Sequence, residues 1–109
     1  MARHYVVTTT APTRDEASRL ARLAVEARLA ACAQVSGPIS STYWWDGAVQ
    51  VAEEWVCSCK APAGAVEALA GALRAAHGYD TPEIVATPIE AGDADYLAWI
   101  DTETAAPDP

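Results

Sequence analysis

One short turn signal most constrains the fold of this chain. Asp46 and Gly47 separate two long stretches of strand-like composition, and an Asp-Gly pair in that position is typical of a tight β-hairpin. Two tryptophans, Trp44 and Trp45, come directly before the turn. Because neighbouring side chains in a strand point to opposite faces of the sheet, one of them can enter the core of a small domain. The other tryptophan then has no place in that core.

The two strands of this hairpin are expected to be long. The first covers residues 32–45 and is interrupted near Pro38, because a proline inside a strand is typical of an edge position or a bulge. The return strand covers residues 48–61 and places Cys57 and Cys59 on the same face. Such a pair can hold a soft metal if further ligands converge on it. No CxxC or His-rich segment lies nearby, which favours buried cysteines in a central strand.

The N-terminal part predicts a strand followed by an amphipathic helix. Residues 4–11 are rich in β-branched and aromatic side chains, which is typical of a strand. Thr13 and Glu16 fit a capping box, with Thr13 as N-cap and Glu16 reaching back to it. Small apolar residues then recur at helical spacing, which predicts a helix that covers one face of the sheet: Ala17, Leu20, Ala21, Ala24, Ala27 and Ala31.

The C-terminal part predicts a helix, a strand and a short closing helix. The first helix begins after Pro62 and ends near His77, with Gly78 in a typical position for the residue after a helix end. A strand is expected over residues 82–90 and the short helix over residues 93–103. The two aspartates at the start of that helix, Asp93 and Asp95, are typical of helix capping rather than of acid–base chemistry.

This order predicts an α+β protein with the ferredoxin-like β-α-β-β-α-β sandwich and a short C-terminal helix. Residues 1–109 are expected to form a single domain, in which residues from about 103 to 109 are a mobile tail with nothing to bury. The two main helices would cover one face of the sheet and leave the other bare. A bare face that carries Val, Trp and Cys is an apolar patch of the kind that marks association.

Composition excludes several classes of protein. The chain has 15 acidic and 7 basic residues, a net charge of −8, which argues against a nucleic-acid partner. No segment approaches the roughly 20 apolar residues of a membrane-spanning helix, and the N-terminus lacks the apolar segment of a signal peptide. The sequence has no Gly-rich phosphate loop, so it does not indicate an organic cofactor. Three cysteines do not indicate a disulfide framework. We therefore expect a cytoplasmic protein with no nucleic-acid or membrane partner.

Four stretches in the right order carry a resemblance to a known family. They are LAAC at residues 29–32, STYWWDG at 41–47, HGYDTPEI at 77–84 and GDADYLAWI at 92–100. Together they resemble the CutA family of divalent-cation tolerance proteins, over about residues 6–100. The resemblance implies a homotrimer similar to the PII signal-transduction proteins, with the sheets packed around a three-fold axis. It also implies that one of Trp44 and Trp45 lies in the subunit's own core and the other against a neighbouring chain.

The resemblance implies a function in the response to metal ions rather than catalysis. Family members are linked to tolerance of copper and other divalent metals, so the expected ligand is Cu²⁺ or another divalent cation, and no enzymatic activity defines the family. Two alternatives stay open. One is an enzyme or small-ligand sensor with a site in the intersubunit cleft, built from Glu54, Lys60, His77 and Tyr79. The other is a structural trimer that anchors another protein.

His77 is the first candidate metal ligand, because a neutral imidazole commonly binds copper and zinc. Some family members place a His pair before a Pro-Tyr element and a Cys near the end of the first strand. Here Ala76 stands in place of the first His and Thr9 in place of the Cys, while Gly78 replaces the Pro. Two of the three implied ligands are therefore absent. The alternative is that His77 lies at a helix C-terminus, where a cation interacts favourably with the helix dipole.

Glu54 and Glu83 are the other candidate metal ligands, because carboxylate oxygens bind divalent ions. Glu54 shares a strand face with Lys60. Together with Tyr79 and Glu83 these residues can line a cleft between subunits, and the resemblance adds Trp44 and Trp45 to the same intersubunit region. The alternative is a salt bridge across chains or a solvated edge.

Overall fold

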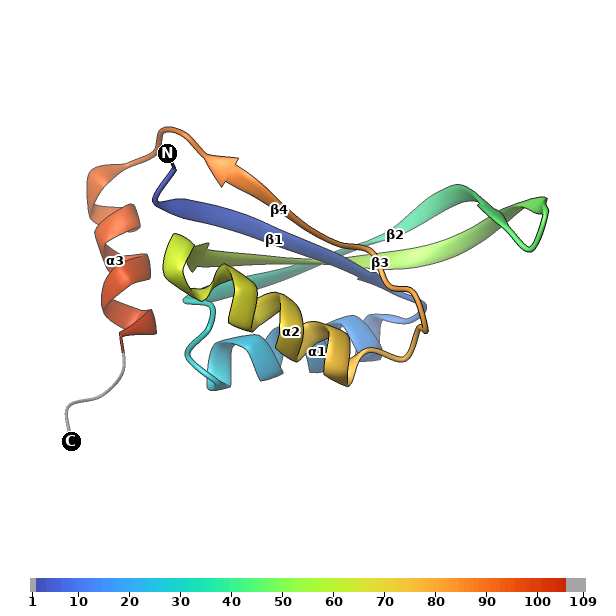
Figure 1. Cartoon of the computed structure of the whole chain (residues 1–109), viewed down its shortest axis with the longest axis horizontal. Coiled ribbons are helices and arrows are strands. Elements are labelled where there is room, and N and C mark those ends of the chain that lie inside the picture. The colour runs from blue at the N-terminus through green and yellow to red at the C-terminus, as the bar shows by residue number, and fades with distance from the viewer. Residues whose placement is uncertain (1, 106–109) are drawn as a thin grey trace.

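The fold is an antiparallel four-stranded sheet with two helices on one face, in a computed structural model that describes residues 2–105 (Figure 1). The sheet order is β2-β3-β1-β4, which confirms the ferredoxin-like α+β architecture. The elements are β1 His4–Ala11, α1 Arg14–Glu26, β2 Cys32–Trp45, β3 Ala48–Pro62, a 3₁₀ turn at Ala63–Ala65, α2 Val66–Ala76, β4 Ile84–Ile89 and α3 Ala94–Thr104.

The core lies between the sheet and the two helices α1 and α2. From the sheet it takes Val7, Cys57 and Cys59, and from the helices it takes leucines at 0% exposure, among them Leu20 and Leu69. Alanines fill the remaining face of α1 and let that helix lie close to the strands. The sequence pattern of small apolar residues therefore identified the correct face of α1.

Helix α1 begins as expected but ends earlier. Thr13 Oγ1 accepts a hydrogen bond from the Glu16 backbone N–H at 3.1 Å, which confirms half of the capping box. The Glu16 carboxylate does not reach back to the cap and instead pairs with Arg19. The helix ends at Glu26 instead of extending to Ala31, because Arg28 adopts a left-handed conformation with φ of 61° that turns the chain toward β2.

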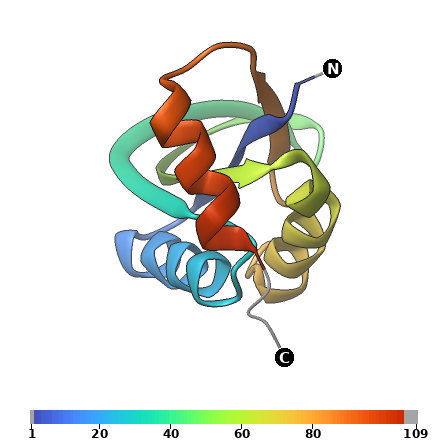
Figure 2. The same ribbon diagram turned by 90° about the vertical axis from the view of Figure 1, so that its left-hand side faces the viewer.

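Helix α3 lies across one end of the sheet, near the N-terminal strand (Figure 2). Ile100 on this helix is fully buried, and His4 Nε2 lies 2.9 Å from Asp101 Oδ1. Arg28 donates to the Glu103 backbone carbonyl oxygen at 2.8 Å. The expected mobile tail from residue 103 is therefore wrong for residues 103 and 104, which belong to α3. Residues 106–109 of that tail lie outside the described part of the chain.

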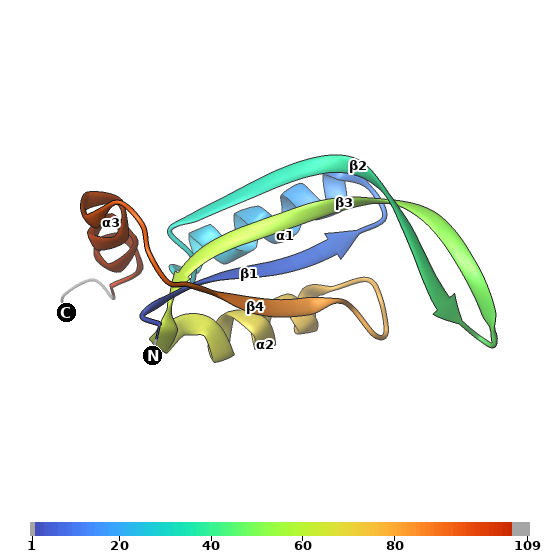
Figure 3. The same ribbon diagram turned by 90° about the horizontal axis from the view of Figure 1, so that it is seen from above.

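Strands β2 and β3 continue beyond the helices as a two-stranded arm that ends at the expected turn (Figure 3). Asp46 and Gly47 both have positive φ, 51° and 75°, as the tight hairpin turn requires. β2 is an edge strand, and its pairing with β3 shifts register between Ser36 and Ile39. The proline signal therefore indicated both the edge and the bulge.

Both tryptophans of the arm are exposed, so the expectation that one of them enters the subunit's own core is wrong. Trp44 is 74% exposed and Trp45 is 55% exposed. The reason is that the arm extends past α1 and α2, so neither of its faces has a helix over it. Val49 at 54% and Val51 at 68% exposure lie on the same arm. We call these four residues, Trp44, Trp45, Val49 and Val51, the hairpin patch.

Candidate functional site

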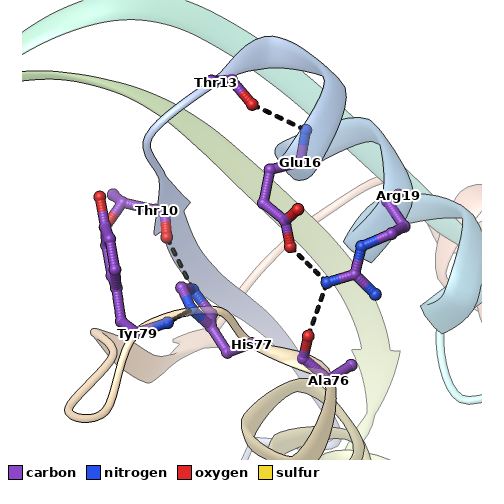
Figure 4. Close-up of polar contacts among 7 residues, drawn as sticks. All are labelled: Thr10, Thr13, Glu16, Arg19, Ala76, His77 and Tyr79. Carbon is purple, nitrogen blue, oxygen red and sulfur yellow. Dashed lines mark hydrogen bonds and ion pairs between the residues drawn. The ribbon is translucent and has the colours of Figure 1, made fainter.

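Polar side chains meet where the end of β1, the start of α1 and the loop after α2 come together (Figure 4). His77 stands at the centre of this cluster as the C-cap residue of α2, with extended φ and ψ of −72° and 142°. Its Nε2 lies 2.8 Å from the Thr10 carbonyl oxygen, and the Tyr79 backbone N–H donates to its Nδ1 at 3.1 Å. His77 therefore links the loop after α2 to the end of β1.

These two contacts fix the state of the His77 ring. A carbonyl oxygen only accepts, so Nε2 carries the proton, and a backbone N–H only donates, so Nδ1 carries the lone pair. The ring is a neutral imidazole with both nitrogens engaged. To bind a metal, His77 must give up one of these hydrogen bonds. The alternative of a protonated His77 at the end of α2 conflicts with the same geometry, because a protonated Nδ1 cannot accept from Tyr79.

Arg19 fulfils the role at the end of α2 that the sequence suggested for His77. Its guanidinium donates to the Ala76 carbonyl oxygen at 2.6 Å and pairs with the Glu16 carboxylate. A cation at a helix C-terminus satisfies free carbonyl groups and interacts well with the dipole. The Arg19 hydrogen bond also lowers the pKa of Glu16. Sequence reasoning missed this link, since only the i, i+3 spacing of Glu16 and Arg19 was visible.

Glu54 and Tyr79, two of the residues expected to line the cleft, contact each other within the single chain. The Tyr79 hydroxyl donates to Glu54 Oε2 at 3.0 Å, and Glu54 is only 9% exposed. Burial and then the hydrogen bond to Glu54 raise the pKa of Tyr79 to about 12, because both disfavour a phenolate next to a carboxylate. The loop that His77 holds thus places the Tyr79 phenol against the nearly buried Glu54 carboxylate.

The other predicted residues lie apart from this pair. Lys60 donates to Gln34 Oε1 at 2.7 Å and lies six positions along β3 from Glu54, roughly 20 Å away at strand spacing. Glu83 is exposed before β4, and Trp44 and Trp45 lie at the end of the arm. Within residues 2–105, no group of three or more His, Cys, Asp or Glu side chains converges.

Two hollows of the surface do not contain the predicted metal ligands either. One, of about 290 Å³, lies beside the bulge and is lined by residues that include Ile39, Val51 and Glu53. Another, of about 300 Å³, lies between the end of α1 and α3 and includes Arg28 and Trp99. A separate finding concerns membranes. Within residues 2–105, none of the helices combines the length and the apolar composition that a membrane crossing requires.

Comparison with known proteins identifies relatives over nearly the whole chain. The family model described as CutA1 divalent ion tolerance protein matches residues 5–103. The divalent-cation tolerance protein CutA of Archaeoglobus fulgidus is 38% identical over 98 residues, which covers 90% of this chain and 95% of that protein. The chloroplastic protein CutA 1 of rice, Oryza sativa, is 37% identical over 99 residues. Those residues are 91% of this chain and 56% of the rice protein, so this chain spans little more than half of that relative.

Solved structures agree with this match. The periplasmic divalent cation tolerance protein CutA from Archaeoglobus fulgidus superposes with a TM-score of 0.90 at 36% identity, over 94% of this chain and 99% of that chain. CutA from Xylella fastidiosa superposes with a TM-score of 0.92 at 34% identity, over 95% of this chain and 100% of that chain. The expected cytoplasmic location is contradicted by these relatives, because one is described as periplasmic and another as chloroplastic.

Proposed function

Since this chain belongs to the CutA1 divalent ion tolerance family, we propose that it is a homotrimer that binds divalent cations, copper among them, in a cleft between subunits. It acts in the response to metal ions and does not catalyse a reaction. The relatives that carry the description divalent-cation tolerance protein support the class of ligand. The choice of copper rests on the resemblance of the sequence motifs.

The hairpin patch is the observation that carries the assembly. Its four apolar side chains are each more than half exposed in the single chain, and an isolated two-stranded arm is marginally stable in water. Exposed apolar residues grouped in this way mark an association surface. In a trimer each arm reaches past its own helices and packs on a neighbouring subunit, which removes the patch from water.

A cleft between subunits also accounts for the scattered candidate ligands. No three metal-binding side chains converge within residues 2–105 of one chain, so a divalent site needs groups from more than one chain. Glu54 is the first ligand we propose, because Tyr79 holds one carboxylate oxygen and fixes the orientation of the other. Glu83 is exposed and available to a neighbour. His77 serves as a positioning residue through its hold on the Tyr79 loop.

The Glu54–Tyr79 pair also favours a second candidate function, a small-ligand sensor or an enzyme site in the same cleft. A nearly buried carboxylate next to a phenol of raised pKa is typical of a site that binds a polar ligand. Lys60 joins such a site only if a neighbouring subunit supplies it, because roughly 20 Å of strand separates it from Glu54 in its own chain.

The test combines mass in solution with ion-dependent stability. We expect sedimentation to give three times the chain mass of 11.5 kDa. Cu²⁺ or Zn²⁺ at 100 times its Kd should stabilise the folded protein by about 2.7 kcal/mol, and Glu54→Gln should remove that effect. Glu53→Gln, an exposed neighbour on the other strand face, is the matched control and should keep it. A single-chain mass, or equal stabilisation of the Glu54→Gln variant, would contradict the proposal.

A further inference from the structure

A hollow of about 300 Å³ lies where the C-terminal ends of α1 and α3 come together (Figure 2). We call it the α1–α3 hollow. Its lining residues are Val25, Glu26, Arg28, Ala30, Ala31, Trp99 and Glu103. Its volume is at the lower end of the range for small-ligand sites, roughly 300–1,000 Å³. None of these residues belongs to the Glu54–Tyr79 pair or to the hairpin patch, so the hollow is separate from the cleft proposed above.

Two arginines hold the carboxylates of the hollow in place. Arg28 follows α1 in the left-handed conformation, with φ of 61°. Its Nη1 donates to the backbone carbonyl oxygen of Glu103 at 2.8 Å and to the Oε2 of Glu103 at 3.2 Å. On α1, the Arg22 Nε donates to Glu26 Oε1 at 2.6 Å. Within residues 2–105, the second oxygen of each carboxylate makes no hydrogen bond to the protein, so it is available to a ligand.

An indole and three aliphatic side chains supply the apolar surface of the hollow. Trp99 is 41% exposed and stacks on Tyr96, with ring centroids 5.6 Å apart and planes at 29°. This stacking restrains the indole. Val25, Ala30 and Ala31 line the same hollow. Indole is the side chain that attracts a cation most strongly through its ring face, so the apolar surface also suits a positively charged ligand.

The local charge favours a cation over an anion. In α3, Ala94–Thr104, the charged residues are Asp95, Asp101 and Glu103, and none is basic. Neither α1 nor α3 has a basic residue in its last turn, and a helix C-terminus carries partial negative charge. Arg28 is the basic residue among those that line the hollow, and it already pairs with Glu103. An anionic ligand would therefore meet the carboxylates without a free cation to receive it.

We propose that the α1–α3 hollow binds a small organic cation, a primary ammonium ion with an apolar body. The apolar body packs against Trp99 and Val25. The ammonium group donates to the free oxygens of Glu26 and Glu103, and charge-assisted hydrogen bonds of this kind are stronger than neutral ones. A bare metal ion does not fit, because no group of three metal-binding side chains converges within residues 2–105.

The test is a nuclear magnetic resonance titration of the full chain, labelled with ¹⁵N, with benzylammonium chloride. Benzyl alcohol and benzoate are the matched probes, since they carry the same ring without the positive charge. Benzylammonium should shift the indole N–H signal of Trp99 and the backbone signals of residues 25–31. Benzyl alcohol should bind about ten-fold more weakly, and benzoate should not bind. Equal affinity for benzylammonium and benzyl alcohol, or no shift of these signals with benzylammonium, would overturn the proposal.

Two variants assign the binding to the lining residues. Trp99→Leu should weaken benzylammonium binding about ten-fold, and its missing indole signal identifies the Trp99 resonance. Glu103→Gln keeps the size of the side chain and should weaken binding about three- to five-fold. Asp95→Asn is the matched control, because Asp95 is an exposed carboxylate of the same helix that does not line the hollow. It should keep wild-type affinity, and wild-type affinity in Trp99→Leu or in Glu103→Gln would overturn the proposal.

This site lies within one chain and does not depend on the proposed function. The Glu54→Gln variant should bind benzylammonium as the wild type does. Trp99→Leu should keep the trimer mass and the Glu54-dependent effect of divalent ions. The failure of either proposal is therefore distinguishable from the failure of the other.

Discussion

The two ends of the β2–β3 ladder are made by the same pair of strands but have opposite surroundings. At one end α1 and α2 cover the sheet and Cys57 and Cys59 are fully buried. At the other end the arm has no cover, and Trp44 and Val51 are among the most exposed apolar residues of the chain. An edge that must stay in water usually carries charged residues or proline. This difference supports the proposal that another chain buries the arm.

The largest expected effect comes from removing the two indoles of the hairpin patch. Replacing both Trp44 and Trp45 by Ser should weaken association by roughly 4 kcal/mol, close to a thousand-fold, because buried tryptophans dominate protein interfaces. Sedimentation should then give the single-chain mass of 11.5 kDa. Far-UV circular dichroism should change little, since neither side chain contributes to the core.

Val25→Ser is the control for this experiment, because Val25 is an exposed apolar residue of α1 outside the arm. Its variant should keep the wild-type mass. If the double tryptophan variant keeps that mass as well, the two ends of the ladder differ for another reason and the patch is not the association surface.

An intermediate effect is expected at the junction between the covered end and the arm. A Cβ at Gly37 would lie 2.9 Å from Trp55 Cε3, and the φ of 150° is unfavourable for other residues. Gly37→Ala should therefore lower the free energy of unfolding by about 1–3 kcal/mol, measured by urea denaturation. Gly71→Ala in α2 has open space around it and should raise stability by up to about 1 kcal/mol. Equal results for the two variants would show that the bulge is not a packing constraint.

The smallest effect is expected from the Glu54–Tyr79 hydrogen bond at the same junction. Tyr79→Phe should cost about 1 kcal/mol at pH 7. In the wild type the folded pKa of Tyr79 is raised from 10 to about 12. The unfolded chain therefore ionises first, and this contribution is complete below pH 10 and is lost as the pH rises toward 12.

Denaturant unfolding at a series of pH values between 8 and about 11.5 measures this dependence. The Tyr79→Phe variant should have a shallower decline than the wild type. Tyr5→Phe removes one phenol elsewhere on the sheet and is the matched control for the loss of a hydroxyl group. A Tyr79→Phe variant with an unchanged slope would separate the phenol from Glu54 and remove the pair from the candidate site.

Local signals in the sequence predicted most of the fold. The strand composition gave β1 at residues 4–11 as observed, and the Asp46-Gly47 pair gave the turn of the arm. Pro38 indicated the bulge, and Thr13 indicated the start of α1. In each case the residues that carry the signal also make the relevant contacts, so a short window of sequence contains the cause.

The candidate site was less predictable because its contacts join distant segments. The alternation of side chains between the two faces of β3 correctly placed Glu54 and Lys60 on one face. It does not bring them together, because six positions of strand separate them. The role of His77 depends on the Thr10 carbonyl, 67 positions away, and that of Arg19 depends on Ala76, 57 positions away. The exposure of both tryptophans depends on where the helices end relative to the arm. The pattern of residues within one strand does not predict contacts between segments that lie far apart in the sequence.

The position of β1 has a consequence for folding during synthesis of the chain. This first strand lies in the interior of the sheet, between β3 and β4, yet β4 ends only at Ile89. During synthesis the backbone groups on one side of β1 therefore stay unpaired until β4 leaves the ribosome. Pairing of two strands so far apart in the sequence is intrinsically slow. A chain stalled before β4 would expose that side of β1, and an unpaired strand edge is a template for aggregation.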